Sequence, residues 1–304
     1  MRPYLLFISA VTAWAGMSVA PDYQLFSINS ILTFIALFFA YGFGQALTDC
    51  FQVDTDKISA PYRPLSKGIV STKSVATVSI TGLFLITIVL VYLNLWNILL
   101  CVLSVAGLYT YTFVKRRVWW GGPFYNAWIV ALLPIMGYLS ISGKSLSALE
   151  DKSLQMLIVL SFFSYATFVL IGYLKDITAD RESGYKTFPV VFGWNAAVWV
   201  SDIFIIISLI SCFKLVQHDL KAIVISSIAL IIYLTGQIYA HTTKQKVETN
   251  TVLPVTSTVR SFILLHLAVL LAFNPDNISI LIAAGLFYIV FEITLAMRPE
   301  MGQI

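Results

Sequence analysis

Residues 74–93 read SVATVSITGLFLITIVLVYL, a stretch of 20 positions without a charged side chain. A helix needs roughly 20 apolar residues to cross a membrane, so this stretch predicts a transmembrane span. Outward from it, further apolar runs of spanning length cover residues 4–20, 26–47, 95–114, 123–141, 154–174, 196–213, 222–240, 254–273 and 278–297. We therefore expect an all-α integral membrane protein with nine to ten transmembrane helices.

The first run could be mistaken for a secretion signal, since small residues close it at Ser18-Val19-Ala20. It is longer than a typical signal core, and the next span follows after a short link. We interpret it as a retained helix.

The composition of the whole chain supports a membrane location. Of its 304 residues, 59% are apolar and only 11% are charged, and the mean hydropathy is +0.86. Soluble domains carry about 25% charged residues, so this chain has too few charges to cover a surface in water. A soluble enzyme, a nucleic-acid-binding module and a disordered regulator are excluded. Three cysteines without CxxC spacing also argue against a disulfide framework or a structural zinc site.

Positive charges are concentrated in every second connection between the predicted spans. They are Lys57, Arg63, Lys67, Lys73, Lys115, Arg116, Arg117, Lys175, Arg181, Lys186, Lys244 and Lys246. Because positively charged loops stay on the cytoplasmic side, we expect these connections and both termini to be cytoplasmic.

Two of these connections, Thr48–Thr72 and Lys175–Trp194, are long and hold six of the 15 acidic residues. Those six are Asp49, Asp54, Asp56, Asp176, Asp180 and Glu182. In both loops, spaced carboxylates are followed by Tyr, a basic residue, Pro and Gly. Such matched segments indicate internal repeats around one site. We predict a single transmembrane domain, 1–304, with related halves at about 1–114 and 123–240 and a C-terminal hairpin at 254–297.

Helical spacing suggests which side chains act together. On a regular helix Asp49, Gln52 and Asp56 lie within roughly 60° of one another, with Thr48 beside them. Asp176 and Asp180 are four residues apart and share a face. Facing carboxylates backed by Arg and Lys suit a diphosphate bridged by Mg²⁺, which takes oxygen ligands. The alternative is that these residues are ordinary solvated charges. The presence of two matched loops favours a shared binding site over this alternative.

With these motifs, the chain resembles the UbiA superfamily of intramembrane prenyltransferases over nearly its whole length. Asp49 to Gly68 is similar to the family's first motif, NDxxDxxxD followed by a YRP-type segment. Asp176 to Pro189 is similar to the second motif, DxxxD followed by G-x-x-T-x-P. The chain departs from the first motif at Thr48, where Asn is usual, and at Gln52, where the central Asp is usual.

The resemblance implies two helical bundles around a central cavity open to the lipid bilayer, with both motifs facing each other in a polar cap. In that family Mg²⁺ and the motif carboxylates hold an isoprenyl diphosphate whose C1–O bond ionises. The resemblance places four residues at metal-binding and catalytic positions: Asp49, Asp56, Asp176 and Asp180. Residues expected to contact the substrate are Thr48, Gln52, Arg63, Lys115, Arg181 and Lys186. Lys115 could equally be an ordinary cytoplasmic anchor.

Three functions remain open from the sequence. The first is transfer of the prenyl group to a lipophilic acceptor, commonly an aromatic one. The second is a UbiA-type terpene cyclase, because altered first motifs occur among these enzymes and a cyclase needs no acceptor. The third is a non-catalytic membrane protein with a degraded site, which only Gln52 supports.

Overall fold

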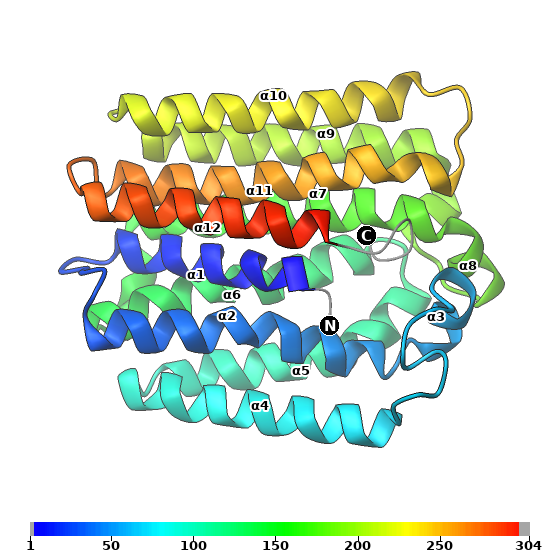
Figure 1. The fold of residues 1–304 in the computed structure, drawn as a ribbon, viewed down its shortest axis with the longest axis horizontal. Coiled ribbons are helices and arrows are strands. Elements are labelled where there is room, and N and C mark those ends of the chain that lie inside the picture. The colour runs from blue at the N-terminus through cyan, green and yellow to red at the C-terminus, as the bar shows by residue number, and fades with distance from the viewer. Residues whose placement is uncertain (1–2, 298–304) are drawn as a thin grey trace.

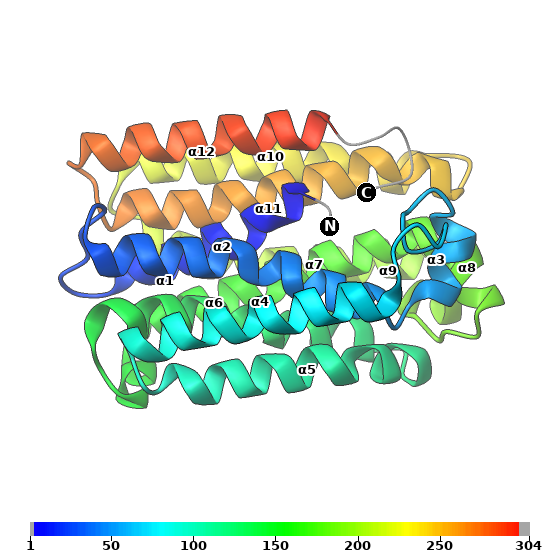
Figure 2. The same cartoon turned by 60° about the horizontal axis from the view of Figure 1, so that its bottom comes forward.

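The structure, a computed structural model, describes residues 3–297, and the described chain folds into one bundle of helices without β-strands. Most helices lie side by side along one direction (Figures 1 and 2). The long helices are α1 (Leu6–Val19), α2 (Ile28–Asp49), α4 (Thr72–Leu93), α5 (Asn97–Arg117), α6 (Gly121–Ser142), α7 (Lys152–Gly172), α9 (Phe188–Val216), α10 (Leu220–Thr242), α11 (Val252–Ala272) and α12 (Ile278–Ala296). The short ones are η1 (Pro3–Leu5), α3 (Val53–Ser59), η2 (Leu146–Glu150), η3 (Tyr173–Asp176), α8 (Ile177–Glu182) and η4 (Glu248–Thr251).

The number of transmembrane helices agrees with the prediction from the sequence. Within residues 3–297, nine helices are long and apolar enough to cross a membrane, and Pro3–Val19 forms a shorter apolar helix before them. A tight hairpin lies at Asn94, since α4 ends at Leu93 and α5 begins at Asn97. The protein is therefore a multi-pass integral membrane protein.

The short first helix lies in the interior. Every residue of α1 from Phe7 to Val19 is buried, as expected for a helix that is apolar on all sides. Its closest approach is to α6, where a Cβ on Gly16 would lie 2.2 Å from the Pro134 carbonyl oxygen. A Cβ on Gly137 would likewise lie 2.3 Å from the Ala13 carbonyl oxygen. Glycine at these two positions lets the backbones pack closely.

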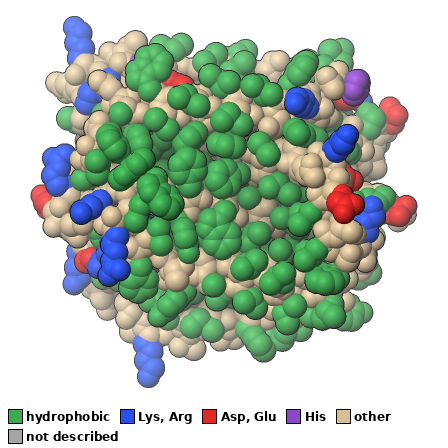
Figure 3. Space-filling view, turned by 180° about the vertical axis from the view of Figure 1, so that it is seen from behind, with side chains coloured by type: hydrophobic (Ala, Val, Ile, Leu, Met, Phe, Trp, Pro, Cys, Tyr) green, Lys and Arg blue, Asp and Glu red, His purple; other side chains and the backbone are tan. Residues whose placement is uncertain are grey.

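The outer surface carries a broad apolar band. Figure 3 shows hydrophobic side chains across the middle of one face, with charged side chains gathered at the two ends. Two pairs of ionisable side chains connect neighbouring long helices, as expected for such groups within a membrane. Arg260 of α11 binds Glu292 of α12 through two nitrogens at 2.8 Å, and His241 of α10 lies 2.7 Å from Asp202 of α9.

The two acidic loops lie at the same end of the bundle, on the right in Figures 1 and 2, where α3 packs against α8. Their local structure corrects one expectation: neither motif lies on a continuous helix. After Asp49 the chain tightens, with Phe51 and Gln52 donating to carbonyls three residues back, and α3 begins only at Val53. The second motif breaks at Asp176, between η3 and α8. The regular helical directions predicted for Gln52, Asp56 and Asp180 are therefore wrong.

Candidate active site

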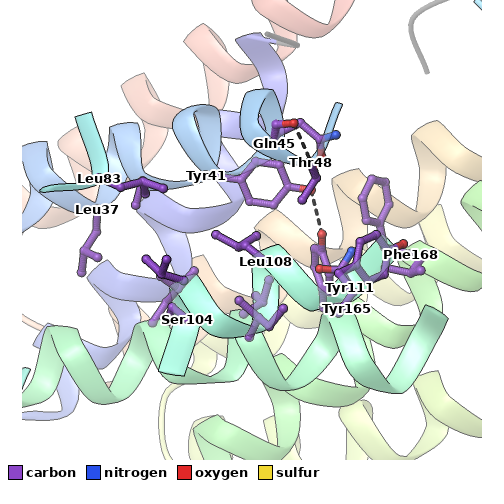
Figure 4. A pocket seen from close by; sticks show the side chains of 18 of the residues that line it. Leu37, Tyr41, Gln45, Thr48, Leu83, Ser104, Leu108, Tyr111, Tyr165 and Phe168 are labelled. Carbon is purple, nitrogen blue, oxygen red and sulfur yellow. Dashed lines mark hydrogen bonds between the residues drawn. The ribbon is translucent and has the colours of Figure 1, made fainter. Parts of the chain in front are cut away.

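An elongated cavity runs into the bundle from the end that carries the two loops. It encloses about 1300 Å³, counting the part that opens outward, and is bounded mainly by α2, α4, α5, α6 and α7. Figure 4 shows Leu37, Leu83, Ser104 and Leu108 along its length and Tyr41, Gln45 and Thr48 toward the loop end. The lining residue Val105 of α5 is 39% exposed. The expected central cavity is present, and its opening to the lipid bilayer stays a prediction.

The charged side chains that line this cavity, Lys115, Lys175 and Asp176, all lie at its loop end, together with the polar Gln45, Thr48, Gln52, Tyr111, Asn126 and Tyr173. Farther along the wall, Thr87 and Ser104 are also polar. The remaining wall consists mostly of Leu, Ile, Val, Met and Phe side chains. A cavity of this kind fits a molecule with one charged head and a long apolar tail.

The first motif contributes neutral groups to the cavity and keeps its carboxylates elsewhere. Thr48 and Gln52 line the wall, and the Gln52 amide donates to the Thr112 hydroxyl at 3.2 Å. Asp49 accepts a hydrogen bond from the Gln45 amide at 2.6 Å. Asp56 is buried and binds Arg63 at 2.5 Å. Neither carboxylate is among the lining residues.

The second motif places one carboxylate in the cavity and buries the other. Asp176 lines the wall beside Lys175, whose ammonium contacts both of its oxygens at 2.8 and 2.6 Å. Asp180 is fully buried, accepting from the Lys115 ammonium at 3.2 Å and from the Thr187 hydroxyl at 3.1 Å. Of the four predicted metal ligands, Asp176 is thus the one that faces the cavity.

Lys115 is not a membrane anchor. It is 4% exposed, lines the cavity and lies 4.9 Å from the ring centres of both Tyr173 and Tyr185. Cation–π contact and the Asp180 carboxylate together compensate for its burial. Lys115 therefore brings a positive charge to the polar end of the cavity.

The other predicted phosphate contacts lie apart from the cavity wall. Arg63 is held by Asp56, whereas Arg181 and Lys186 are exposed. Lys175 takes a place among the lining cations that the sequence did not single out. The sequence could have indicated this role, because Lys175 directly precedes Asp176 and a residue beside a cavity-facing carboxylate is itself close to the wall.

Mg²⁺ fits this site if the substrate supplies part of its coordination. Among residues 3–297, no group of three or more His, Cys, Asp or Glu side chains is arranged to hold a metal ion. However, Mg²⁺ is usually bound by one or two carboxylates together with substrate phosphates and water. Asp176, Gln52 and Thr48 offer oxygen atoms along one wall, next to two lysines that suit phosphate.

Two tyrosine pairs cross the cavity and were missed from the sequence. Tyr41 of α2 and Tyr165 of α7 share a hydrogen bond of 2.7 Å, which Figure 4 shows inside the cavity. Nearer the loops, Tyr111 of α5 and Tyr173 of η3 share one of 2.6 Å. Single tyrosines in apolar spans are common, so only the folded structure reveals these pairs.

Comparison with known proteins decides the family. The model of the UbiA prenyltransferase family matches residues 9–262. The chain belongs to this family. It is a prenyltransferase of the UbiA superfamily, as the two aspartate-rich motifs predicted.

Three individual proteins resemble this chain at 16–25% sequence identity. A digeranylgeranylglyceryl phosphate synthase of Thermococcus kodakarensis is 25% identical over 213 residues, covering 70% of this chain and 74% of that protein. A UbiA homolog from Aeropyrum pernix, solved in its apo form, matches the fold with a TM-score of 0.72 at 20% identity, covering 93% and 98% of the two chains. A UbiA homolog from Archaeoglobus fulgidus, solved with GPP and Mg²⁺, gives a TM-score of 0.57 at 16% identity and covers 97% and 98%. These structures support the fold of this chain.

Proposed function

We propose that this prenyltransferase takes an isoprenyl diphosphate into the cavity and transfers the prenyl group to a lipophilic acceptor. The observation that carries the proposal is the one-sided distribution of charged groups, with Lys115, Lys175 and Asp176 at one end of a long, mostly apolar cavity. A diphosphate head fits the first part and an isoprenyl tail the second. The solved homolog that holds GPP and Mg²⁺ supports this class of donor.

The residues at the polar end can prepare the donor for C1–O cleavage. Lys115 and Lys175 would contact phosphate oxygens, while Asp176 and Gln52 would hold Mg²⁺. When bound, Mg²⁺ would neutralise the charge that develops on the leaving diphosphate. Tyr111 and Tyr173 line the same region and share a hydrogen bond, and their rings would exclude bulk water from the allylic cation.

For the acceptor, we propose a glyceryl phosphate that already carries one geranylgeranyl chain, with geranylgeranyl diphosphate as donor. This follows the name of the Thermococcus relative rather than the aromatic acceptor expected from the sequence. The acceptor hydroxyl oxygen forms a bond to C1 as the C1–O bond to diphosphate breaks. The bonding electrons leave with the diphosphate, which also takes the hydroxyl proton.

An assay of the purified protein with Mg²⁺ and labelled geranylgeranyl diphosphate tests the proposal. Three reactions are compared by mass spectrometry: with geranylgeranylglyceryl phosphate, with a hydroxylated aromatic acid, and without acceptor. We expect an ether product only in the first. A prenylated aromatic product would reassign the acceptor, and cyclic terpenes without acceptor would indicate a cyclase. Failure to release diphosphate in all three reactions would overturn the proposal.

We further propose that the polar end of the cavity faces the cytoplasm. Arg116 and Arg117 follow Lys115 at this end, and the positive-inside rule supports this orientation. Cysteines introduced singly at the exposed Arg181 and Lys186 should react with an impermeant maleimide only after cells are opened. Labelling of intact cells would reverse the orientation.

A further inference from the structure

The short helix α8 of the second motif begins without the usual capping hydrogen bond. Asp176 stands at its N-cap position, where an aspartate side chain ordinarily accepts from the backbone N–H groups of the first turn. The Asp176 side chain makes no such bond. It lines the cavity instead, with the Lys175 ammonium on its carboxylate. The first turn of α8 therefore takes its acceptor from elsewhere.

Glu248 of η4 supplies this acceptor. Its carboxylate oxygen Oε1 accepts from the Thr178 backbone N–H at 2.6 Å. Because the acceptor is a carboxylate at the N-terminus of a helix, the bond is charge-assisted and favourable. The second motif is thus capped by the loop between α10 and α11, which Figure 1 shows at the same end of the bundle as α8.

The loop that carries Glu248 is itself held in place. On one side of it, the Lys246 ammonium donates to two carbonyls at the end of α10, at 2.8 and 2.9 Å. On the other side, the Asn250 amide donates to the Gln245 carbonyl at 2.9 Å. With the backbone fixed before and after it, Glu248 presents its carboxylate to α8 from a steady support.

We propose that Glu248 is a positioning residue that caps α8 so that the Asp176 carboxylate stays in the cavity. Without Glu248, Asp176 can turn to the N–H groups of its own helix, which a side chain at the N-cap reaches by rotation. This inference rests on the proposed function, because it concerns the carboxylate that is proposed to hold Mg²⁺. It gives a role in the site to a loop that has no aspartate-rich motif.

A double-mutant cycle in protein without Mg²⁺ or substrate tests the cap by itself. In Glu248→Ala the Asp176 carboxylate can take over the cap, and in Asp176→Ala the Glu248 carboxylate still provides it. The double variant loses the cap, so its melting temperature should fall about 2 °C further than the sum of the two single losses. Additive losses would overturn the proposal.

Glu182→Ala is the matched control for this cycle, because it removes the same charge from the exposed far end of the same helix. Combined with Asp176→Ala, it should give additive losses. An equal excess loss with Glu182→Ala would trace the effect to charge alone and would also overturn the proposal.

The Mg²⁺ dependence of the active enzyme tests the consequence for the site. Glu248→Ala should raise the Mg²⁺ concentration for half-maximal diphosphate release about fivefold, equivalent to about 1 kcal/mol, because the new cap competes with the metal for Asp176. Saturating Mg²⁺ should restore the rate. Glu248→Gln keeps an acceptor oxygen and should stay within about twofold of wild type. An unchanged Mg²⁺ requirement in Glu248→Ala, or an equal rise in Glu248→Gln, would overturn the positioning role.

The two measurements separate this proposal from the proposed function. If the wild-type enzyme releases no diphosphate with any donor, the proposed function fails, and the cycle without Mg²⁺ still decides whether Glu248 caps α8. If the wild-type enzyme is active and the losses in the cycle are additive, only the role of Glu248 fails.

Discussion

The two motif loops have the same backbone plan but present different charges to the cavity. Gln52 and Asp176 each stand immediately before a short helix, with φ, ψ of −121°, 20° and −118°, 13°. Four residues later, Asp56 and Asp180 are both buried against a cation, Arg63 and Lys115 respectively. The equivalent positions thus differ mainly at the break, where one loop offers an amide and the other a carboxylate.

This difference assigns unequal roles to the two loops. Negative charge reaches the cavity wall from Asp176 of the second loop, while the first loop lines it with the neutral Thr48 and Gln52. The end of α5 joins the loops, because Lys115 binds Asp180 and the next residue, Arg116, binds Asp54. We infer that the first loop mainly shapes the site and the second mainly supplies its charge.

Removing the cavity carboxylate is the strongest way to test this asymmetry. Asp176→Ala should lower kcat by at least about 10³-fold, because metal stabilisation of developing charge is worth several kcal/mol and 1.36 kcal/mol is tenfold. Asp54→Ala is the matched control from the first loop, since that carboxylate is half-exposed and pairs with Arg116. Its diphosphate release should stay within about twofold, as surface ion pairs contribute little. Equal losses in both variants would contradict the asymmetry.

The buried cation between the loops gives the next largest effect. Lys115→Met should lower kcat about 10²-fold, as expected when one charge-stabilising group is lost. It should also lower the free energy of unfolding by about 3–5 kcal/mol, because the Asp180 carboxylate is left buried without its cation. Thermal unfolding and diphosphate release are measured on the same preparations.

A double variant separates these two effects of Lys115. Lys115→Met with Asp180→Asn should recover much of the stability, since no buried charge remains unpaired. It should recover none of the activity if the ammonium contacts the diphosphate. Recovery of both would show that Lys115 has only a structural role.

The sequence predicted the helices well because each span depends on local apolar composition. It also predicted that the two acidic loops meet, since charge alternation puts both on one side of the membrane. It could not predict which carboxylates face the cavity. That depends on helix breaks at Gln52 and Asp176, where tertiary contacts such as the Gln52–Thr112 hydrogen bond override a regular helix. The assignment of Asp49, Asp56, Asp176 and Asp180 as metal ligands stays a prediction.

The helix breaks at Gln52 and Asp176 can be given the same side chain by one substitution. Gln52→Asp adds a carboxylate to the cavity wall at the place equivalent to Asp176. We expect the Mg²⁺ concentration for half-maximal activity to fall about tenfold, because carboxylate ligands tune affinity for hard cations. Gln52→Asn keeps the amide and is the matched control, with no such fall. An unchanged Mg²⁺ requirement in Gln52→Asp would separate the first loop from the metal altogether.

The smallest effect concerns Asp49 and can be measured on its neighbour Cys50. Burial raises the pKa of the Cys50 thiol, and the Asp49 carboxylate raises that pKa further. Alkylation requires the thiolate, so its rate should increase only at a higher pH than for an ordinary cysteine. Asp49→Asn removes one cause of the raised pKa and moves this increase to lower pH. Because such a charge is worth about 1 kcal/mol in water, the rate at a fixed pH should rise by less than about fivefold.

The same thiol can show whether Asp49 joins the metal site. Cys101 and Cys212 are buried and Cys50 is partly exposed, so a maleimide should label Cys50 first. If Asp49 binds Mg²⁺, adding Mg²⁺ and donor neutralises its charge, and the labelling rate of the wild-type protein approaches that of Asp49→Asn. If Asp49 stays with Gln45 as in the present structure, Mg²⁺ and donor leave the difference between the two proteins intact. The first result would give the first loop a share of the metal, and the second would leave that role to Asp176.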